Sequence, residues 1–257
     1  MHEIRPINAT ETDEFLELLC SVFGLDLKAA RTIFYQEPLF DLNRKWALFD
    51  HGRMVSILTT SPLRFGWGRA AGVAGVATLP EARGKGLAAK LMRAAMTATS
   101  DLGEPAFILF AADARLYSQL GFEVVDDVIR GEVSASAPGD EPRILEQSEV
   151  RSIYTRWATE RTDRLVRTSQ KWEAWTWTLK HCEERGSGYV CIEPVLLREA
   201  ILPGVQGPWP VPQGTIFYGL SRTAETLGIP LISSRKEMMV MTHGFPEPPV
   251  MFMTDQF

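Results

Sequence analysis

Residues 76–89 read Val-Ala-Thr-Leu-Pro-Glu-Ala-Arg-Gly-Lys-Gly-Leu-Ala-Ala, and the predicted architecture follows from these residues. It begins in an apolar run typical of a buried strand, passes a proline, and turns through two glycines into the start of a helix. Gly84 and Gly86 permit backbone angles that side chains forbid, and they let a ligand approach the main chain. The free amides and the dipole of a helix start attract an anion, and Arg83 and Lys85 add positive charge. The stretch therefore predicts a pyrophosphate site.

Two other phosphate-binding signatures do not fit these residues. Dinucleotide-binding Rossmann folds place their glycines in another register and follow them with an acidic residue about 20 positions on. P-loops end in Gly-Lys-Ser/Thr, whereas residues 84–86 are Gly-Lys-Gly. The strand, the Arg-Gly-x-Gly turn and the helix thus indicate a different type of anion site.

Strands and helices alternate on both sides of this stretch. Apolar strands are predicted at 46–49, 54–60, 72–79 and 106–112. A helix from Leu87 has one apolar face, and another runs from Arg115 to Leu120, before Gly121 ends it. This order predicts a mixed α/β (α+β) sheet flanked by helices, with a right-handed crossover.

A polar, proline-containing segment at residues 134–143 is predicted to be a linker. Beyond it, Leu227-Gly228-Ile229 follows an apolar strand and a short helix, just as Leu120-Gly121-Phe122 does before it. This echo predicts two tandem domains, residues 1–133 and 144–257, each with a mixed sheet. Further strands are predicted at 188–193, 195–202, 215–220, 237–242 and 250–255.

Composition and charge narrow the classes of partner. The 257 residues are 45% hydrophobic and carry a formal net charge of −5, and neither half is basic, so no nucleic-acid partner is expected. No apolar run is long enough for a membrane span and the N-terminus lacks a secretion signal, so we expect a cytoplasmic protein with no membrane partner. The four histidines have no metal-ligand spacing, and no metal is expected.

The three cysteines, Cys20, Cys182 and Cys191, are an odd number without a close pairing pattern. They are predicted to be reduced, mostly buried thiols. A reactive-cysteine enzyme is the alternative interpretation, although none of the three stands beside an obvious base.

The stretch at 76–89 resembles the cofactor-binding signature of the GNAT superfamily of N-acetyltransferases, Arg/Gln-x-x-Gly-x-Gly/Ala, in which Arg83, Gly84, Gly86 and Ala88 stand. The resemblance implies that this loop holds the pyrophosphate of acetyl-CoA, the cosubstrate, and that the preceding strand pairs with the pantetheine arm. The cosubstrate-binding residues that it implies are Val76, Ala77, Thr78, Arg83, Gly84, Lys85, Gly86, Leu87, Ala88 and Ala89.

A second family mark follows at residues 116–123, Leu-Tyr-Ser-Gln-Leu-Gly-Phe-Glu. It is similar to the tyrosine helix of the family, which is followed by Gly-Phe or Gly-Tyr. The resemblance covers residues 3–133.

The longer arrangement is similar to the enhanced intracellular survival (Eis) type of acetyltransferase, in which a degenerate GNAT domain follows the active one. Residues 153–172 resemble the opening of that second domain. The second copy has no Arg-x-x-Gly-x-Gly, and Ala224 stands where Tyr117 stands in the first copy. The second copy is therefore expected to bind no acetyl-CoA and to have a structural or acceptor-site role. The Eis type also carries a third, sterol-carrier-like domain, for which this chain is expected to have no room.

Attack of an amine on a thioester needs a polarised carbonyl, an acid for the leaving thiolate and a base. The main chain at 76–78 is expected to donate an amide to the oxyanion, and Tyr117 is the candidate acid, with ring packing as its alternative role. In the Eis type the carboxylate of a final phenylalanine reaches the active site, which implicates Phe257. Glu37, Asp41 and solvent are further candidates for the base.

These observations predict an N-acetyltransferase that transfers the acetyl group of acetyl-CoA to a primary amine of a small molecule or peptide, by direct attack in a ternary complex. A homo-oligomer is compatible with the sequence. Two alternatives stay open: a tandem-domain acyltransferase that acts on a thiol-precursor amine, resembling mycothiol synthase, and a CoA-binding sensor without acceptor activity.

Overall fold

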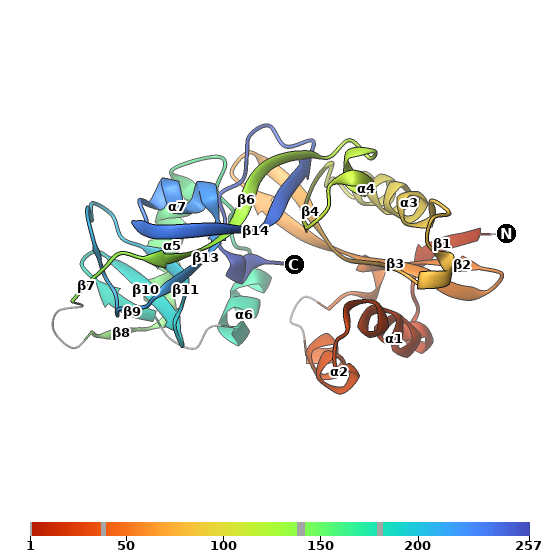
Figure 1. Cartoon of the computed structure of the whole chain (residues 1–257), viewed down its shortest axis with the longest axis horizontal. Helices are drawn as coiled ribbons and strands as arrows, with labels where there is room; N and C mark the ends of the chain where they lie inside the picture. The colour runs from red at the N-terminus through yellow and green to blue at the C-terminus, as the bar shows by residue number, and fades with distance from the viewer. Residues whose placement is uncertain (1, 37–39, 138–141, 179–181) are drawn as a thin grey trace.

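Twelve strands form one continuous mixed sheet that runs along the molecule (Figure 1). The structure, a computed structural model, describes residues 2–36, 40–137, 142–178 and 182–257, with residues 36 and 174–178 described by their backbone alone. In spatial order the strands are β1 (His2–Pro6), β2 (Lys45–Asp50), β3 (Arg53–Phe65), β4 (Gly68–Thr78), β5 (Ala106–Ala111), β14 (Leu231–His243), β6 (Glu123–Val133), β13 (Ile216–Leu220), β11 (Leu196–Ile201), β10 (Gly188–Glu193), β9 (Cys182–Arg185) and β8 (Ile144–Leu145). The predicted mixed α/β class is confirmed, and the two expected sheets are joined edge to edge.

The two halves of the chain exchange a strand at the centre of this sheet. β5 pairs antiparallel with β14, from Met239↔Ala111 to His243↔Phe107, although β14 comes from the second half. Conversely, β6 of the first half pairs antiparallel with β13 of the second, and β6 and β14 pair with each other. The sheet therefore crosses the predicted boundary at 134–143. The division into two domains stays a prediction, and residues 138–141 lie outside the described residues.

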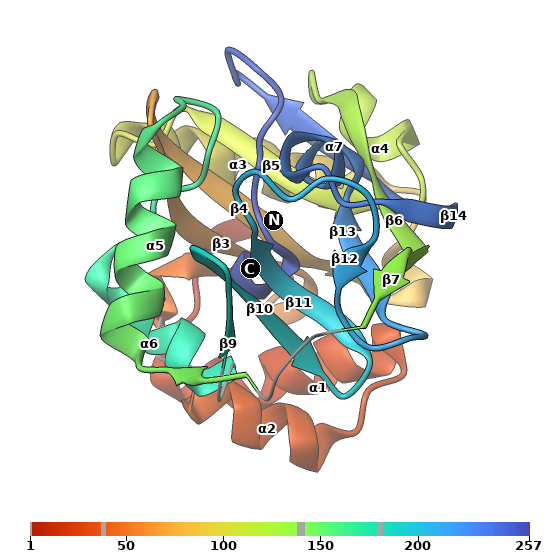
Figure 2. The same ribbon diagram turned by 90° about the vertical axis from the view of Figure 1, so that its left-hand side faces the viewer.

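Helices cover both faces of the first half of the sheet (Figure 1). Successive strand residues point to opposite faces: Leu48 and Leu58 pack with α3 (Leu87–Asp101), whereas Ala47 and Ile57 pack with α1 (Thr12–Phe23). The second half is flanked by α5 (Gln147–Thr159), α6 (Ser169–Thr178) and α7 (Ser221–Leu227), as Figure 2 shows from its end. The remaining helices are α2 (Leu27–Gln36), α4 (Arg115–Ser118) and the 3-10 helices η1 (Ala9–Glu11), η2 (Leu42–Arg44), η3 (Pro80–Ala82) and η4 (Met253–Asp255).

The two central strands β4 and β5 run parallel but pair over only three residues, from Ala70↔Ala106 to Gly72↔Ile108. Beyond this point β4 has a bulge, because the register with β3 shifts between Ile57↔Ala77 and Thr59↔Ala74. Gly75 lies within the bulge at φ +60°, a left-handed conformation that favours glycine. The bulge bends β4, so the two strands diverge after Gly72 and leave a gap in the sheet.

The echo between the two halves is visible in the backbone. Tyr117 O accepts a hydrogen bond from Phe122 N at 3.1 Å, and Ala224 O accepts the same bond from Ile229 N at 2.9 Å. Gly121 and Gly228 both take a positive φ, at +80° and +67°, as residues that end a helix do. Two small strands, β7 (Ala135–Ser136) and β12 (Trp209–Pro210), form a separate parallel pair.

Two expectations for the second half are wrong. Cys182 and Cys191 are not free thiols: they form a disulfide across the β9–β10 hairpin, with a Cα–Cα distance of 4.4 Å. Opposite residues of an antiparallel pair lie about 4.5 Å apart where they exchange no hydrogen bonds, which is close enough for a disulfide. The predicted strand at 250–255 is not a strand either. It makes an isolated bridge from Val250 to Arg164 and then turns into η4.

Candidate active site

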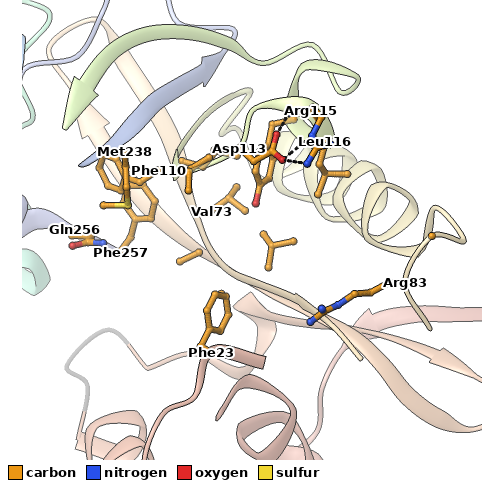
Figure 3. A pocket seen from close by; sticks show the side chains of 18 residues that line it. Phe23, Val73, Arg83, Phe110, Asp113, Arg115, Leu116, Met238, Gln256 and Phe257 are labelled. Atoms are coloured by element: carbon orange, nitrogen blue, oxygen red, sulfur yellow. Dashed lines mark hydrogen bonds and ion pairs between the residues drawn. The ribbon is translucent and has the colours of Figure 1, made fainter. Parts of the chain in front are cut away.

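A cleft of about 860 Å³ opens where β4 and β5 diverge. Its walls come from β4 at 73–76, β5 and its following loop at 109–113, and α4 at 115–117. Phe23 at the end of α1 and Met238 of β14 complete it, together with the last residues, 256 and 257. Figure 3 shows Arg83 at one end of this cleft and Met238, Phe110 and Phe257 together at the other.

The predicted anion loop occupies the first end. Arg83 and Gly84 line the cleft, and Arg83 Nε donates a 3.0 Å hydrogen bond to Thr78 O at the end of β4. Gly84 and Gly86 take φ +75° and +70°, and Gly86 caps the N-terminus of α3 without a side-chain hydrogen bond. The first amides of α3 have no partner within the helix, so they are available to an anionic ligand.

The ten predicted cosubstrate residues have different surroundings. Val76, Arg83 and Gly84 line the cleft, and Gly86 together with Leu87, Ala88 and Ala89 forms the start of α3. Ala77, by contrast, is only 2% exposed and packs in the core beneath α1. The Thr78 hydroxyl lies 2.8 Å from the hydroxyl of Ser56. Lys85 is exposed in the loop before α3.

Tyr117 is half-buried in α4 and lines the cleft. Its ring packs edge-on against Phe122, with 6.2 Å between the ring centroids. Burial, with a smaller contribution from the negative charge of Asp113, raises the pKa of the Tyr117 phenol. Arg115 pairs with the Asp113 carboxylate and lowers its pKa. The phenol is therefore held in its protonated form, which is the form that can donate a proton.

Phe257 enters the cleft from the opposite end. Its ring stacks on Phe110 of β5, with ring centroids 5.4 Å apart and planes inclined by 15°. The ring also lies against the backbone of Gly72, where a Cβ would fall 2.1 Å from the Phe257 Cγ. Gly72 is the last β4 residue that pairs with β5, so the ring fills the point at which the two strands part.

Of the other candidates for a base, Asp41 is not brought into the cleft. The Asp41 carboxylate caps η2 by accepting a 2.9 Å hydrogen bond from Asn43 N, and Asp41 is not among the described residues that line the cleft. Glu37 lies outside the described residues.

Sequence reasoning missed Gly75, Phe110, Met238 and Gln256, which also line the cleft. A glycine inside an apolar strand often marks a bulge, so the position of Gly75 within the apolar run 72–79 could have predicted the bulge. Phe110 lay within a predicted strand, but its exposure to the cleft depends on the divergence of β4. The position of Met238 in the cleft depends on the pairing of β14 with β5, which the sequence does not reveal.

The described residues contain no candidate metal-binding group and no candidate membrane-spanning helix. No three histidine, cysteine, aspartate or glutamate side chains in this part of the chain form a group that could hold a metal ion. No helix within the described ranges is long and apolar enough to span a bilayer.

Comparisons with known proteins agree with this fold. Residues 3–125 match the family model of the acetyltransferase (GNAT) domain. A GCN5-related N-acetyltransferase from Kribbella flavida is 17% identical, with 94% of this chain and 71% of that chain covered at a TM-score of 0.73. A GCN5-related N-acetyltransferase from Anabaena variabilis is 18% identical, with 94% and 72% covered at 0.69. Eis1 from Mycobacterium abscessus is 14% identical, with 93% and 73% covered at 0.61.

At these identities the structural similarity concerns the fold. A search of curated proteins finds no match. The family model covers the anion loop, the diverging strands and the Tyr117 helix together. Residues 3–125 of this chain are therefore an acetyltransferase domain of the GNAT family.

Proposed function

We propose that the protein is an N-acetyltransferase that transfers the acetyl group of acetyl-CoA to a primary amine by direct attack in a ternary complex. The observation that carries the proposal is that one cleft holds the Arg83 loop, Tyr117 and Phe257. These residues are far apart in the sequence. Cosubstrate binding, protonation of the leaving thiolate and deprotonation of the amine need them in one place.

The Arg83 end supports binding of acetyl-CoA. Gly84 and the free amides at the start of α3 suit a pyrophosphate, because backbone N–H groups and the helix dipole favour negative charge. From there the pantetheine arm would run along β4, whose edge towards β5 is unpaired beyond Gly72. Of the ten implied residues, Val76, Arg83 and Gly84 have the strongest support, because they line the cleft.

Each step of the transfer has a candidate group. A main-chain N–H of β4 near the Gly75 bulge donates to the developing oxyanion, a role that backbone amides fill in acyl transfer. The amine nitrogen attacks the carbonyl, the carbon–sulfur bond breaks, and Tyr117 donates its proton to the departing thiolate. The base that takes the proton of the amine is the main-chain carboxylate of Phe257, a residue that lines the cleft.

The acceptor would bind at the end opposite Arg83. Phe110, Met238 and Phe257 form an apolar wall there (Figure 3), which favours a primary amine on an apolar or aromatic body, either a small molecule or the side of a peptide. Because Met238 belongs to β14, the second half contributes to this end of the cleft. A cytoplasmic location and a homo-oligomer remain predictions.

The proposal is tested by following CoA release with acetyl-CoA and a panel of amines. The panel should contain arylalkylamines, peptides, polyamines and aminoglycosides at equal concentrations. We expect turnover with at least one amine, and the highest kcat/KM with the arylalkylamines or with peptides that have apolar side chains. Tight acetyl-CoA binding without turnover on any amine would contradict the proposal and favour a CoA-binding sensor.

A further inference from the structure

The segment that carries Phe257 into the cleft is fixed by a buried group of charges in the second half. Asp255, in η4, is 1% exposed, and its two carboxylate oxygens accept hydrogen bonds of 2.8 Å each from Nε and Nη2 of Arg167. The side chain of Arg167 is fully buried. A bidentate, charge-assisted pair of this kind fixes orientation as well as distance.

The neighbours of this pair complete a group that we call the Arg167 cluster: Arg167, Lys171, Glu199 and Asp255. Arg167 also pairs with the buried carboxylate of Glu199, which in turn accepts hydrogen bonds from Thr254 Oγ1 and from Tyr189 Oη at 2.9 Å. Lys171 Nζ donates to the main-chain oxygen of Asp255 at 3.3 Å. Among the described residues, the cluster thus brings two cations next to two anions in the core.

Aromatic rings hold the guanidinium of Arg167 in turn. It lies 4.0 Å from the ring centroid of Tyr154 and 4.9 Å from that of Trp172. Both rings belong to the core of the second half, so the cluster is anchored to that core and not to the cleft. The chain leaves it at Asp255.

The cluster limits where Phe257 can go. Two residues of extended chain span at most about 7 Å, so a fixed Asp255 confines Phe257 to the mouth of the cleft. There the ring stacks on Phe110 and lies over Gly72. Buried ion pairs are often no more stabilising than apolar replacements of similar size. Placement of the C-terminal segment is therefore a better explanation of these charges than stability.

We propose that the Arg167 cluster holds Phe257 in the cleft, and that Arg167 and Asp255 are positioning residues for acetyl transfer. The inference rests on the proposed function, in which Phe257 takes part in the reaction. By this arrangement the second half of the chain, which lacks a counterpart of Tyr117, sets the geometry of the reaction in the first.

Asp255→Asn tests the proposal, because it removes the charge and keeps the size of the side chain. We expect kcat to fall about ten-fold or more, since small displacements of reacting groups are costly, with an unchanged KM for acetyl-CoA. The matched control is Asp163→Asn: Asp163 is also 1% exposed and is held by Arg161 and Arg222, but it does not carry Phe257. It should keep the kcat of the parent protein.

Two further measurements separate positioning from a structural role. With Phe257 removed, Asp255→Asn should reduce kcat no further, because both changes act through one residue. Independently of activity, carboxypeptidase A should release Phe257 faster from Asp255→Asn than from Asp163→Asn or the parent chain, at a temperature well below every melting transition.

The outcomes distinguish the two proposals. Wild-type kcat and an unchanged release rate in Asp255→Asn, or losses that multiply in the double variant, would overturn the positioning role alone. Full activity after removal of Phe257 would overturn the catalytic role of Phe257 and the inference with it. If Phe257 is released faster from Asp255→Asn and the parent protein acetylates no amine, the result would support the role of the Arg167 cluster in holding Phe257 and would contradict the proposed function.

Discussion

The guanidinium of Arg167 and the carboxylate of Asp255 are joined by two hydrogen bonds of 2.8 Å in the core of the second half, two residues before the phenylalanine that enters the cleft of the first half. Together with the exchange of β6 and β14, this pair makes the two halves interdependent. β14 contributes Met238 to the cleft. The Arg167 cluster fixes Asp255, from which the last two residues run towards the cleft.

Replacing Arg167 by methionine should destabilise the protein strongly. The substitution leaves Glu199 and Asp255 as buried carboxylates without their guanidinium partner, and breaking a buried ion pair in this way costs about 3–5 kcal/mol. The free energy of unfolding from urea titration measures the loss. Arg143→Met is the control, because Arg143 pairs with Glu149 and Glu184 on the surface, where such pairs contribute about 1 kcal/mol or less. Equal losses in the two variants would contradict the prediction.

Gly72→Ala should displace the ring of Phe257 without touching the Arg167 cluster. The new Cβ would lie 2.1 Å from Phe257 Cγ, so the ring must move, and we expect kcat to fall by about one to two orders of magnitude. The matched control is Gly219→Ala, whose Cβ would lie 2.5 Å from the Phe217 ring in the second half. Steady-state kinetics decide the matter, and wild-type kcat in Gly72→Ala would argue against a catalytic role for Phe257.

Tyr117→Phe should lower kcat by about 10²–10⁴-fold, the range typical of general acids, and leave the Kd for acetyl-CoA nearly unchanged. Tyr35→Phe, at a residue 54% exposed on α2, should be neutral in the same assays. Similar kcat values for Tyr117→Phe and the parent protein would leave the ring with a packing role.

The pH profile should carry the signature of the same phenol. Because burial and the charge of Asp113 raise the pKa of Tyr117 above its ordinary value of about 10, the acid stays protonated and kcat should decline only above that pH. Asp113→Asn removes the smaller of the two causes, so the alkaline limb should move to lower pH. A limb that does not move in Asp113→Asn, or that is still present in Tyr117→Phe, would show that another group titrates.

Gly86→Asp should abolish binding of acetyl-CoA, because it places a carboxylate at the start of α3, where the amides attract an anion. Gly86→Asn separates charge from backbone conformation. Asparagine and aspartate both tolerate the left-handed region in which Gly86 lies, at φ +70°, so the Asn variant should bind more weakly than the parent but measurably. Calorimetric titration with acetyl-CoA measures both affinities, and equal affinities for the two variants would argue against an anion site here.

The disulfide between Cys182 and Cys191 predicts one free thiol, that of Cys20. Thiol titration of the denatured, unreduced protein should count one thiol, and three after reduction. Closing a loop with a sequence separation of 9 residues stabilises a fold by about 2–3 kcal/mol in the chain-entropy description, so reduction should lower the melting temperature. Three thiols before reduction would instead support the reduced state predicted from the sequence.

The parts of the site that are contiguous in the chain could be predicted from local sequence patterns. The strand, the glycine turn and the start of α3 follow one another within residues 76–89, as do α4, Tyr117 and Gly121 within the next strand–helix unit. Apolar periodicity and glycine positions report local backbone conformation directly. The disulfide could also have been predicted locally, because a hairpin turn at Gly186 places Cys182 opposite Cys191.

Contacts between residues that are far apart in the chain could not be predicted in this way, because they depend on how the two halves fold together. The pairing of β14 with β5, the short β4–β5 register and the burial of Arg167 against Asp255 join residues from opposite halves. No local pattern encodes such partners, because a strand's apolar face specifies burial but not the identity of the neighbouring strand. The cleft therefore combines a locally encoded glycine loop with an apolar end that forms only once both halves have folded together.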